Sequence, residues 1–177
     1  MNTEPPSRDP NRAFVDATEP LPDRRHPYRL PEEFYRAIAL PMVVTACSKD
    51  RMPLLVGEAA ELVVGALTDQ ARRFGISVCG YCVMPDHIHL VITQELPEAE
   101  FMKFMRHFKS EAARRINAAG LCAGKFRWQR TYWDKFVEGD GSLAAAVQYV
   151  LENPVRRGLC ERADDWPHSA VLALDDP

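Results

Sequence analysis

Apolar positions along the chain switch between the two-residue period of strands and the 3.6-residue period of helices. Runs rich in β-branched residues at 42–47, 76–84 and 87–93 predict three strands. Apolar stripes with helical spacing over 58–74 and about 97–117 predict two amphipathic helices between and after them. The first two thirds of the chain therefore contain the order strand, helix, strand, strand, helix.

The C-terminal third predicts one more strand and one more helix. Aromatic residues crowd the run 130–137, which we interpret as the fourth strand, and a helix follows from about 140 to Glu152. Asn153-Pro154 ends this helix, because the residue before proline avoids helical backbone angles. The complete order is the split βαβ, ferredoxin-like pattern. We expect an α+β fold with a four-stranded antiparallel sheet, both crossover helices on one face, and the C-terminal helix at the other face or its edge.

The N-terminal segment differs from the rest in composition. Residues 1–31 hold seven prolines, charges of both signs and no apolar periodicity, which predicts a disordered arm or a surface extension. A short helix is expected around 31–38. The chain has 177 residues, of which 46% are hydrophobic. This length and composition suit one domain with a substantial core, and we expect residues 32–177 to form it.

Charge is distributed unevenly along the chain. The formal net charge is −3, yet residues 101–136 hold nine Lys and Arg against Glu111 and Asp134. This segment therefore carries +7 and the remainder −10. Such a local basic stripe is typical of a surface that binds a polyanion, although a pair of solvated surface elements has the same composition.

Cysteine usage and hydropathy suggest a protein of the reducing cytoplasm. The five cysteines do not form a paired framework, and Cys79 and Cys82 should face opposite sides of one strand, which disfavours a zinc site. We interpret all five as free thiols. No apolar run has the length of a membrane span, and the N-terminus lacks a signal-peptide core, so we expect a soluble cytoplasmic protein without a membrane partner.

Two short motifs carry the chemistry. His87 and His89 lie at i and i+2 of a predicted strand, so both imidazoles point to one face and can hold a metal ion. Tyr149 and Asn153 lie at i and i+4 of a predicted helix, one above the other. Two neighbouring chemistries are excluded, because a histidine triad needs a third histidine where Val91 stands, and two-histidine phosphodiesterases need Ser or Thr two residues after each histidine.

Four motifs together resemble the REP-associated tyrosine transposases, which are single-tyrosine HUH transposases of insertion sequences. They are MPDHIHLVI, WQRTYWDKFV, YVLENPVRRGL and DDWPHSA, in the family's order and spacing over roughly residues 40–170. The resemblance implies that His87 and His89 bind the metal, that Tyr149 is the nucleophile, and that Asn153 is a third metal ligand. It implies a divalent metal, Mg²⁺ or Mn²⁺, and a ferredoxin-like palm.

The function implied is a metal-dependent single-stranded DNA endonuclease and strand transferase. It would act at hairpin-forming repetitive palindromes through a 5′-phosphotyrosine, with no nucleotide cofactor, as a monomer or homodimer. Two alternatives stay open. One is a domesticated, non-catalytic binder of single-stranded DNA or RNA on the same fold, and the other is a nuclease that uses water while Tyr149 is structural.

DNA contacts are expected from two basic segments. Residues 127–130 combine cations, an aromatic ring and an amide, as base stacking with backbone binding requires, and a second pair of cations follows the tyrosine helix. These candidates are Arg127, Trp128, Gln129, Arg130, Arg156 and Arg157. Trp133 is expected in the core. The chain departs from the family pattern at Lys135, where His is common, and at Glu138, where Arg is common. The acid at Glu138 in place of a cation would weaken DNA binding.

Overall fold

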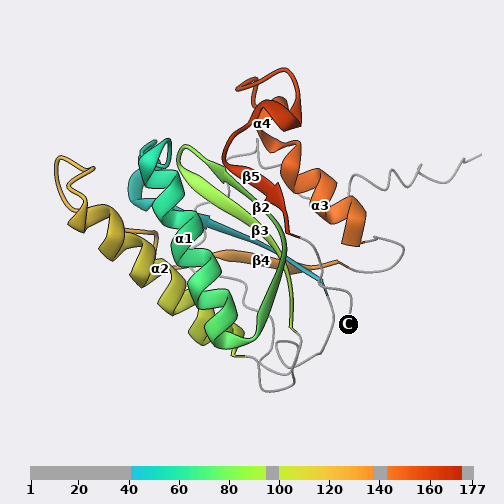
Figure 1. The fold of residues 1–177 in the computed structure, drawn as a ribbon, viewed down its shortest axis with the longest axis horizontal. Helices are drawn as coiled ribbons and strands as arrows, with labels where there is room; N and C mark the ends of the chain where they lie inside the picture. The colour runs from blue at the N-terminus through green and yellow to red at the C-terminus, as the bar shows by residue number, and fades with distance from the viewer. Residues whose placement is uncertain (1–40, 95–99, 138–142, 173–177) are drawn as a thin grey trace, which may run out of the picture.

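A computed structural model describes residues 41–94, 100–137 and 143–172, and it contains one five-stranded sheet (Figure 1). The strands lie in the order β4-β1-β3-β2-β5, and every neighbouring pair is antiparallel. Their bounds are β1 Met42–Cys47, β2 Ile76–Met84, β3 His87–Gln94, β4 Trp133–Phe136 and β5 Ser169–Val171. The first four strands have the order of the ferredoxin-like fold, and β5 adds an edge beside β2.

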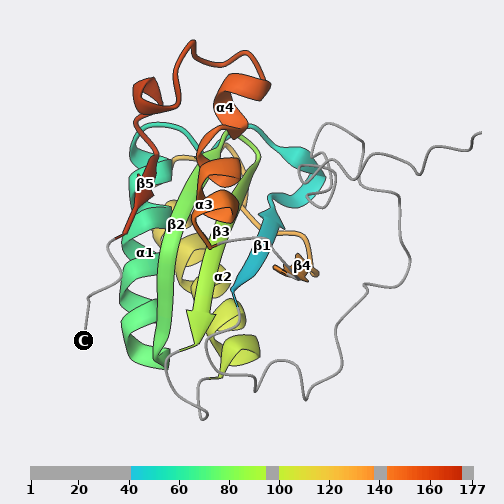
Figure 2. The same ribbon diagram turned by 90° about the vertical axis from the view of Figure 1, so that its right-hand side faces the viewer.

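Helices cover the two faces of the sheet unequally (Figure 2). The crossover helices α1, Glu58–Phe74, and α2, Phe101–Ala118, lie side by side on one face. On the other face, α3, Leu143–Leu151, contacts β2, β3 and β5 and is followed by the short helix α4, Asn153–Arg156. Two single-turn helices, η3 Lys49–Arg51 and η4 Ala163–Asp165, lie in the connections.

The larger core fills the space between the sheet and the crossover helices. Each helix buries one stripe of apolar side chains, because residues three and four positions apart share a face. α1 ends at Gly75, whose left-handed conformation, φ 61°, is one that glycine adopts without steric cost. From α2 the fully buried residues are Phe101, Phe104, Met105, Phe108, Ala112 and Ile116.

A second, smaller core lies between the sheet and α3. Val43, Cys82, Met84 and Val91 of the sheet pack there against Ala146, Val147 and Val150 of the helix. Gly80 of β2 permits this close approach, because a Cβ at that position would lie 3.0 Å from Cγ1 of Val147. The second core therefore fixes how near α3 lies to the β2–β3 hairpin.

The predicted α+β fold with its antiparallel sheet and one-sided crossover helices is confirmed. Three details differ. β4 begins at Trp133 and not near residue 130. β5 was not predicted, because a strand of three residues carries no periodic signal. The chain after Leu151 turns once and resumes as α4, since Pro154 is favourable in a first helical turn. The proline-rich arm and the helix expected near 31–38 lie outside the described residues. So do residues 97–99 of the second predicted helix, which begins in the structure at Phe101.

The expectation that Cys79 and Cys82 face opposite ways is wrong. A register shift between Val78 and Gly80 places both thiols in the second core, because a bulge inserts one residue and reverses the alternation. Both thiols are buried, and burial raises the pKa of Cys82 to about 12. They pack among the apolar side chains of the second core. Among the described residues, no helix has the length and apolar composition needed to cross a membrane.

Candidate metal and nucleophile site

The paired histidines lie at the start of β3, on the face that α3 covers. The β2–β3 hairpin turns at Pro85-Asp86, and the backbone carbonyl of Asp86 accepts a 2.9 Å hydrogen bond from the Ser48 amide, which anchors the turn to the end of β1. His89 lies opposite Cys82 and Thr45 in the register, so all three side chains share one face. Both imidazoles are buried, with 2% and 3% of their residues' surface exposed.

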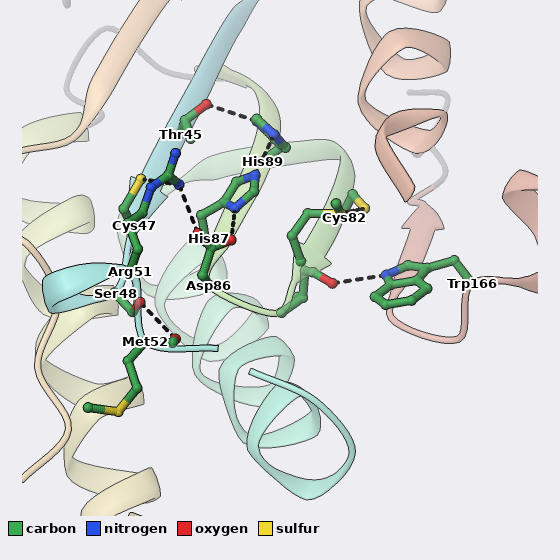
Figure 3. Close-up of polar contacts among 12 residues, drawn as sticks. Thr45, Cys47, Ser48, Arg51, Met52, Cys82, Asp86, His87, His89 and Trp166 are labelled. Carbon is green, nitrogen blue, oxygen red and sulfur yellow. Dashed lines mark hydrogen bonds and ion pairs between the residues drawn. The ribbon is translucent and has the colours of Figure 1, made fainter. Parts of the chain in front are cut away.

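The two rings point their Nε2 atoms at each other across 3.0 Å. Each Nδ1 has its own partner, 2.5 Å from Oδ1 of Asp86 for His87 and 2.8 Å from Oγ1 of Thr45 for His89 (Figure 3). The ring planes are nearly perpendicular, at 88°. Hydrogen-bond contacts thus join four side chains in a row from the hairpin turn to β1, in the order Asp86, His87, His89 and Thr45.

The hydrogen-bond partners fix the position of the proton on one histidine. A carboxylate only accepts hydrogen bonds, so Nδ1 of His87 carries a proton and donates to Asp86. The Thr45 hydroxyl can donate or accept, so Nδ1 of His89 is either the acceptor or the donor in their contact. The 3.0 Å contact between the two Nε2 atoms is a hydrogen bond when one of them carries a proton, and without that proton both lone pairs are available to one metal ion.

Burial disfavours a second proton on His89. It lowers the pKa of His89 well below its ordinary value, and the nearby positive charges of His87, Arg156, Arg157 and Arg51 lower that pKa further. A divalent metal fits the spacing, because two nitrogen ligands bound at about 2.1 Å and at a right angle lie about 3.0 Å apart. The histidine pair therefore has the geometry of two neighbouring ligands on one ion.

Arg51 supports the pair from a strained segment. Its guanidinium lies 3.3 Å from Oδ2 of Asp86 and donates a 3.2 Å hydrogen bond to Sγ of Cys47 (Figure 3). Burial alone would raise the pKa of Asp86, but the hydrogen bond from His87 and the charges of His87 and Arg51 lower it overall. Asp50 and Arg51 have φ of 57° and 52°, rare for residues with a side chain. This strained turn directs Arg51 onto the carboxylate that orients His87.

Tyr149 lies on α3 with its ring half-buried against the second core. The guanidinium of Arg156 lies 4.1 Å from the ring centroid, donates to the Tyr149 backbone carbonyl, and pairs with Glu152 at 3.1 Å. The charge of Arg156 also lowers the pKa of His89. Arg156 is therefore within electrostatic range of both Tyr149 and the histidine pair, and it links the helix to the sheet site.

Asn153 is buried and is the first residue of α4, two positions after the end of α3 at Leu151. Its Nδ2 donates to the backbone carbonyls of Tyr149 and Val150, at 3.1 and 3.0 Å. These bonds cap the end of α3. They involve Nδ2 of Asn153, whereas a metal would bind Oδ1. In the described part of the chain, no cluster of three or more His, Cys, Asp or Glu has metal-binding geometry, so a third ligand from this set is absent there.

The predicted DNA-binding residues fall in two places. Arg156 and Arg157 lie beside the histidine pair, whereas Arg127, Gln129 and Arg130 lie beyond α2. The stacking role expected of Trp128 does not fit its position, because its ring is buried against Phe126 and Phe108, with centroids 5.3 and 6.1 Å away.

Positions on β4 also differ from expectation. Trp133, expected in the core, is only half-buried, and the register places it opposite Thr45 on the histidine face. Lys135 lies on that same face, opposite Val43, whereas Glu138 lies outside the described residues.

Sequence reasoning did not find Thr45 or Arg51. The signal for Thr45 was a polar residue inside an otherwise apolar strand, but its pairing with His89 depends on strand register. No sequence pattern indicated Arg51, because its position results from the unusual turn before it.

Fold and site together define a class: a ferredoxin-like sheet with a buried His-x-His pair on the face covered by a tyrosine-bearing helix. The family model described as "Transposase IS200 like" matches residues 39–153. The chain therefore belongs to the IS200-like transposases, and the resemblance found in the sequence is confirmed.

Individual relatives agree with this assignment. The chain is 32% identical over 115 residues to a Haemophilus influenzae protein of the REP-associated tyrosine transposase type, covering 59% of this chain and 64% of the relative. It is 24% identical over 121 residues to the REP-associated tyrosine transposase of Escherichia coli, covering 68% and 70%. The chain thus spans slightly less than two thirds of the Haemophilus relative.

One solved structure, a REP-associated tyrosine transposase bound to a REP hairpin, is similar with a TM-score of 0.66 over 81% of each chain. The two sequences are 22% identical. At this identity the likeness shows the common fold.

Proposed function

We propose that this transposase is a metal-dependent single-stranded DNA endonuclease and strand transferase. It acts at hairpin-forming repetitive palindromes through a 5′-phosphotyrosine, with Tyr149 as nucleophile. The observation that carries the proposal is the 3.0 Å separation of two buried Nε2 atoms whose Nδ1 atoms are held by Asp86 and Thr45. An IS200-like family membership and a hairpin-bound structural relative support DNA as the substrate.

His87 and His89 would hold a divalent metal, Mn²⁺ or Mg²⁺, through Nε2. A mixed set of nitrogen and oxygen ligands suits Mn²⁺, and Mg²⁺ is compatible when water and phosphate complete the shell. When bound, the metal supplies Lewis-acid chemistry that neutralises charge on the scissile phosphate. Asn153 is proposed as the third ligand through Oδ1, while Nδ2 keeps its bonds to the α3 carbonyls.

The residues around the site prepare it for a phosphate. Arg51, Arg156 and Arg157 all lower the pKa of His89 through their charge, so the site lies in a positive field. Their side chains would attract the DNA backbone and oppose the negative charge that grows on phosphate oxygens as they are attacked. Arg156 also lies over the Tyr149 ring, so its positive charge is held beside the proposed nucleophile.

The reaction is a transfer of one phosphodiester linkage. The Oη atom of Tyr149 attacks phosphorus, the bond from phosphorus to the 3′-oxygen breaks, and the departing oxygen takes up a proton as the phenol loses one. The products are a 5′-phosphotyrosine and a free 3′-hydroxyl. Attack by another 3′-hydroxyl reverses the step and joins strands, so no nucleotide cofactor is consumed.

Incubation with single-stranded hairpin DNA and Mn²⁺, followed by denaturing electrophoresis, tests this function. We expect a covalent protein–DNA adduct from the wild-type protein, and none from Tyr149→Phe, which keeps the ring and loses only the attacking oxygen. Tyr81→Phe is the matched control, because Tyr81 lies on β2 in the same sheet and should not affect adduct formation.

The alternatives give different results. Tight hairpin binding without an adduct from wild-type protein would identify a non-catalytic binder. Cleavage at the wild-type rate by Tyr149→Phe would assign the reaction to water and make the tyrosine structural.

A further inference from the structure

The end of α3 has backbone carbonyls whose partners are side chains. α4 follows α3 after one intervening residue, Glu152, and Pro154 lies in its first turn (Figures 1 and 2). Proline has no N–H, so it cannot donate to the Val150 carbonyl four residues earlier. The Asn153 side chain donates there instead, at 3.0 Å, and also to the Tyr149 carbonyl at 3.1 Å. The interruption at the proline thus makes the end of the tyrosine helix dependent on side-chain donors.

Arg156 is a second side chain that reaches back to this helix end. The backbone at Glu152 stays helical, and residues seven positions apart lie on one side of a helix, because seven residues make nearly two turns. The Arg156 guanidinium donates to the Tyr149 carbonyl, and its Cζ atom lies 4.1 Å from the centroid of the Tyr149 ring. A cation is favoured at a helix C-terminus, where the carbonyls carry partial negative charge. Arg156 therefore contacts both the backbone and the ring of one tyrosine.

Glu152 fixes the direction of the guanidinium. Its Oε2 lies 3.1 Å from Nη1 of Arg156, and its Oε1 accepts a 2.9 Å hydrogen bond from Nε2 of Gln148. The side chains of Arg156 and Glu152 are 31% and 45% exposed, and an exposed ion pair on its own contributes little to stability. Here the carboxylate, the Tyr149 carbonyl and the Tyr149 ring all contact one planar guanidinium, so together they restrict its position.

The Tyr149 ring is held on a second side by apolar packing. It contacts the second core but is only half-buried. A tyrosine side chain exchanges between rotamers unless its neighbours hold it. Reaction rates depend steeply on such placement, because a reacting group displaced by about 1 Å can slow a reaction by about 100-fold. The second core and the guanidinium together limit the rotation of the ring.

We propose that Arg156, fixed by Glu152, is a positioning residue that clamps the Tyr149 ring in the orientation needed for attack on phosphorus. The inference rests on the proposed function, which makes Tyr149 the nucleophile. It goes beyond attraction of the DNA backbone, because a clamp requires the position of the guanidinium and not only its charge. Glu152, an acid beside a site for a polyanion, then has a purpose, since it holds the clamp.

Three variants separate the position of the guanidinium from its charge. Arg156→Gln removes both, and Arg156→Lys keeps the charge but lacks the planar fork that can contact ring, carbonyl and carboxylate together. Glu152→Ala keeps the arginine and removes the carboxylate that fixes it. One control is Arg73→Gln, which removes a guanidinium 5.4 Å from the Phe74 ring on α1. The other is Glu61→Ala, which removes an exposed carboxylate of the same helix.

The single-turnover rate of adduct formation with Mn²⁺ and saturating hairpin DNA measures the effect, so that differences in DNA affinity do not contribute. We expect all three clamp variants to react about 10- to 100-fold more slowly than wild-type protein, and both controls to react at the wild-type rate. Thermal unfolding of each variant verifies that it is folded at the assay temperature. A wild-type or faster rate in Glu152→Ala would overturn the clamp, because freeing a guanidinium that acts only through its charge does not slow the reaction. A wild-type rate in Arg156→Lys would likewise assign the effect to charge.

NMR of the metal-free chain without DNA tests the contact itself. The ring current of an aromatic side chain moves the signals of protons above its face upfield. We expect the Hδ signals of Arg156 to lie upfield in wild-type protein, and to return to ordinary values in Tyr149→Leu and in Glu152→Ala. Ordinary values in wild-type protein would overturn the clamp, because the guanidinium would then not lie over the ring.

The two proposals can fail separately. Wild-type protein that forms the adduct, together with Arg156→Gln that reacts at the wild-type rate, overturns the clamp alone. Wild-type protein that forms no adduct with hairpin DNA and Mn²⁺ overturns the proposed function, and the positioning role with it.

Discussion

Thr45 contacts the ring nitrogen of His89 that lies away from His87, and we propose that this contact orients Nε2 of His89 toward a metal. Its hydroxyl lies 2.8 Å from Nδ1, and both residues are buried opposite each other in the β1–β3 pairing. Groups that hold the second nitrogen of a ligand histidine typically contribute about 10- to 100-fold to metal affinity. A threonine inside a strand can thus be part of the site without contacting the metal.

Thr45→Val should therefore weaken Mn²⁺ binding by about 10-fold or more while preserving the shape of the side chain. Isothermal titration calorimetry measures the affinity. Thr68→Val is the control, since Thr68 is an exposed residue of α1 whose hydroxyl bonds only the Val64 carbonyl. An unchanged Mn²⁺ affinity in Thr45→Val would show that the hydroxyl does not orient His89.

Asn153 has two candidate roles, and two substitutions separate them. Asn153→Ala removes both the amide nitrogen that caps α3 and the oxygen proposed for the metal. Asn153→Asp keeps an oxygen ligand but loses the donor, and it adds a negative charge at a helix C-terminus, where the dipole disfavours it. We expect both variants to lose about 1 kcal/mol or more of stability.

Mn²⁺ affinity then distinguishes the roles. It should fall in Asn153→Ala and recover in Asn153→Asp, as measured by calorimetry beside thermal unfolding. Wild-type affinity in Asn153→Ala, accompanied by lower thermal stability, would make the residue only a cap.

At the scale of elements, the distance between α3 and the β2–β3 hairpin decides whether Tyr149 and the histidine pair act together. Gly80 sets that distance, because Val147 of α3 occupies the space where a side chain would begin. The same helix carries Tyr149 two residues further on. Packing in the second core is thus linked to the position of Tyr149, the proposed nucleophile.

Gly80→Ala should destabilise the protein by about 1–3 kcal/mol, as expected for overpacking of a close contact, and should slow adduct formation because α3 is displaced. Gly124→Ala is the control, since nothing lies within 4 Å of a Cβ there, and its stability should change by less than about 1 kcal/mol. Urea unfolding and adduct kinetics measure the two effects. Equal behaviour of both variants would contradict the packing argument.

The tail is a further element-scale feature of the site. Trp166 donates from Nε1 to the Val83 carbonyl at 2.9 Å (Figure 3). The Val83 amide donates to the His168 carbonyl at 2.8 Å. β5 then pairs with β2 through Gly80, Tyr81 and Cys82. The segment Trp166 to Ser169 thus fastens the tail to β2, the strand next to the histidine strand.

At the scale of the whole molecule, the neutral, buried His89 links folding to pH. Its pKa is lowered in the folded protein from an ordinary value of 6.5, so below pH 6.5 the unfolded chain binds a proton that the folded chain does not. Stability without metal is therefore undiminished above that pH and falls as the pH drops below it. Asp86 acts in a lower window, because its pKa is lowered from 3.8 and its contribution is lost only below that value.

Urea unfolding in EDTA at pH 7.5, 6.5, 5.5 and 4.5 should show this loss, with His89 contributing up to about 1.4 kcal/mol per pH unit. His89→Gln removes the titrating group, so its stability should depend less steeply on pH over the same range, whatever its absolute stability. Parallel curves for the two proteins would show that His89 is not the group responsible.

The amino-acid sequence by itself determined much of this protein through local periodicity. A period of two puts His87 and His89 on one face of a strand, and a period of 3.6 aligns Tyr149 with Asn153, because both spacings follow from backbone geometry. The same periods predicted α1, β1 and β2 with their bounds. The motifs also indicated the transposase family, since they combine these local patterns in a specific order.

Only the tertiary structure decided how the local patterns meet. Thr45 became a partner of His89 through strand register, and Cys79 turned to the face of Cys82 through a bulge whose extra residue leaves no periodic signal. Trp128 is buried, and Trp133 lies on the histidine face, because the chain between α2 and β4 packs against α2. Contacts between residues far apart in sequence depend on which surfaces exclude water together, and this depends on the whole fold.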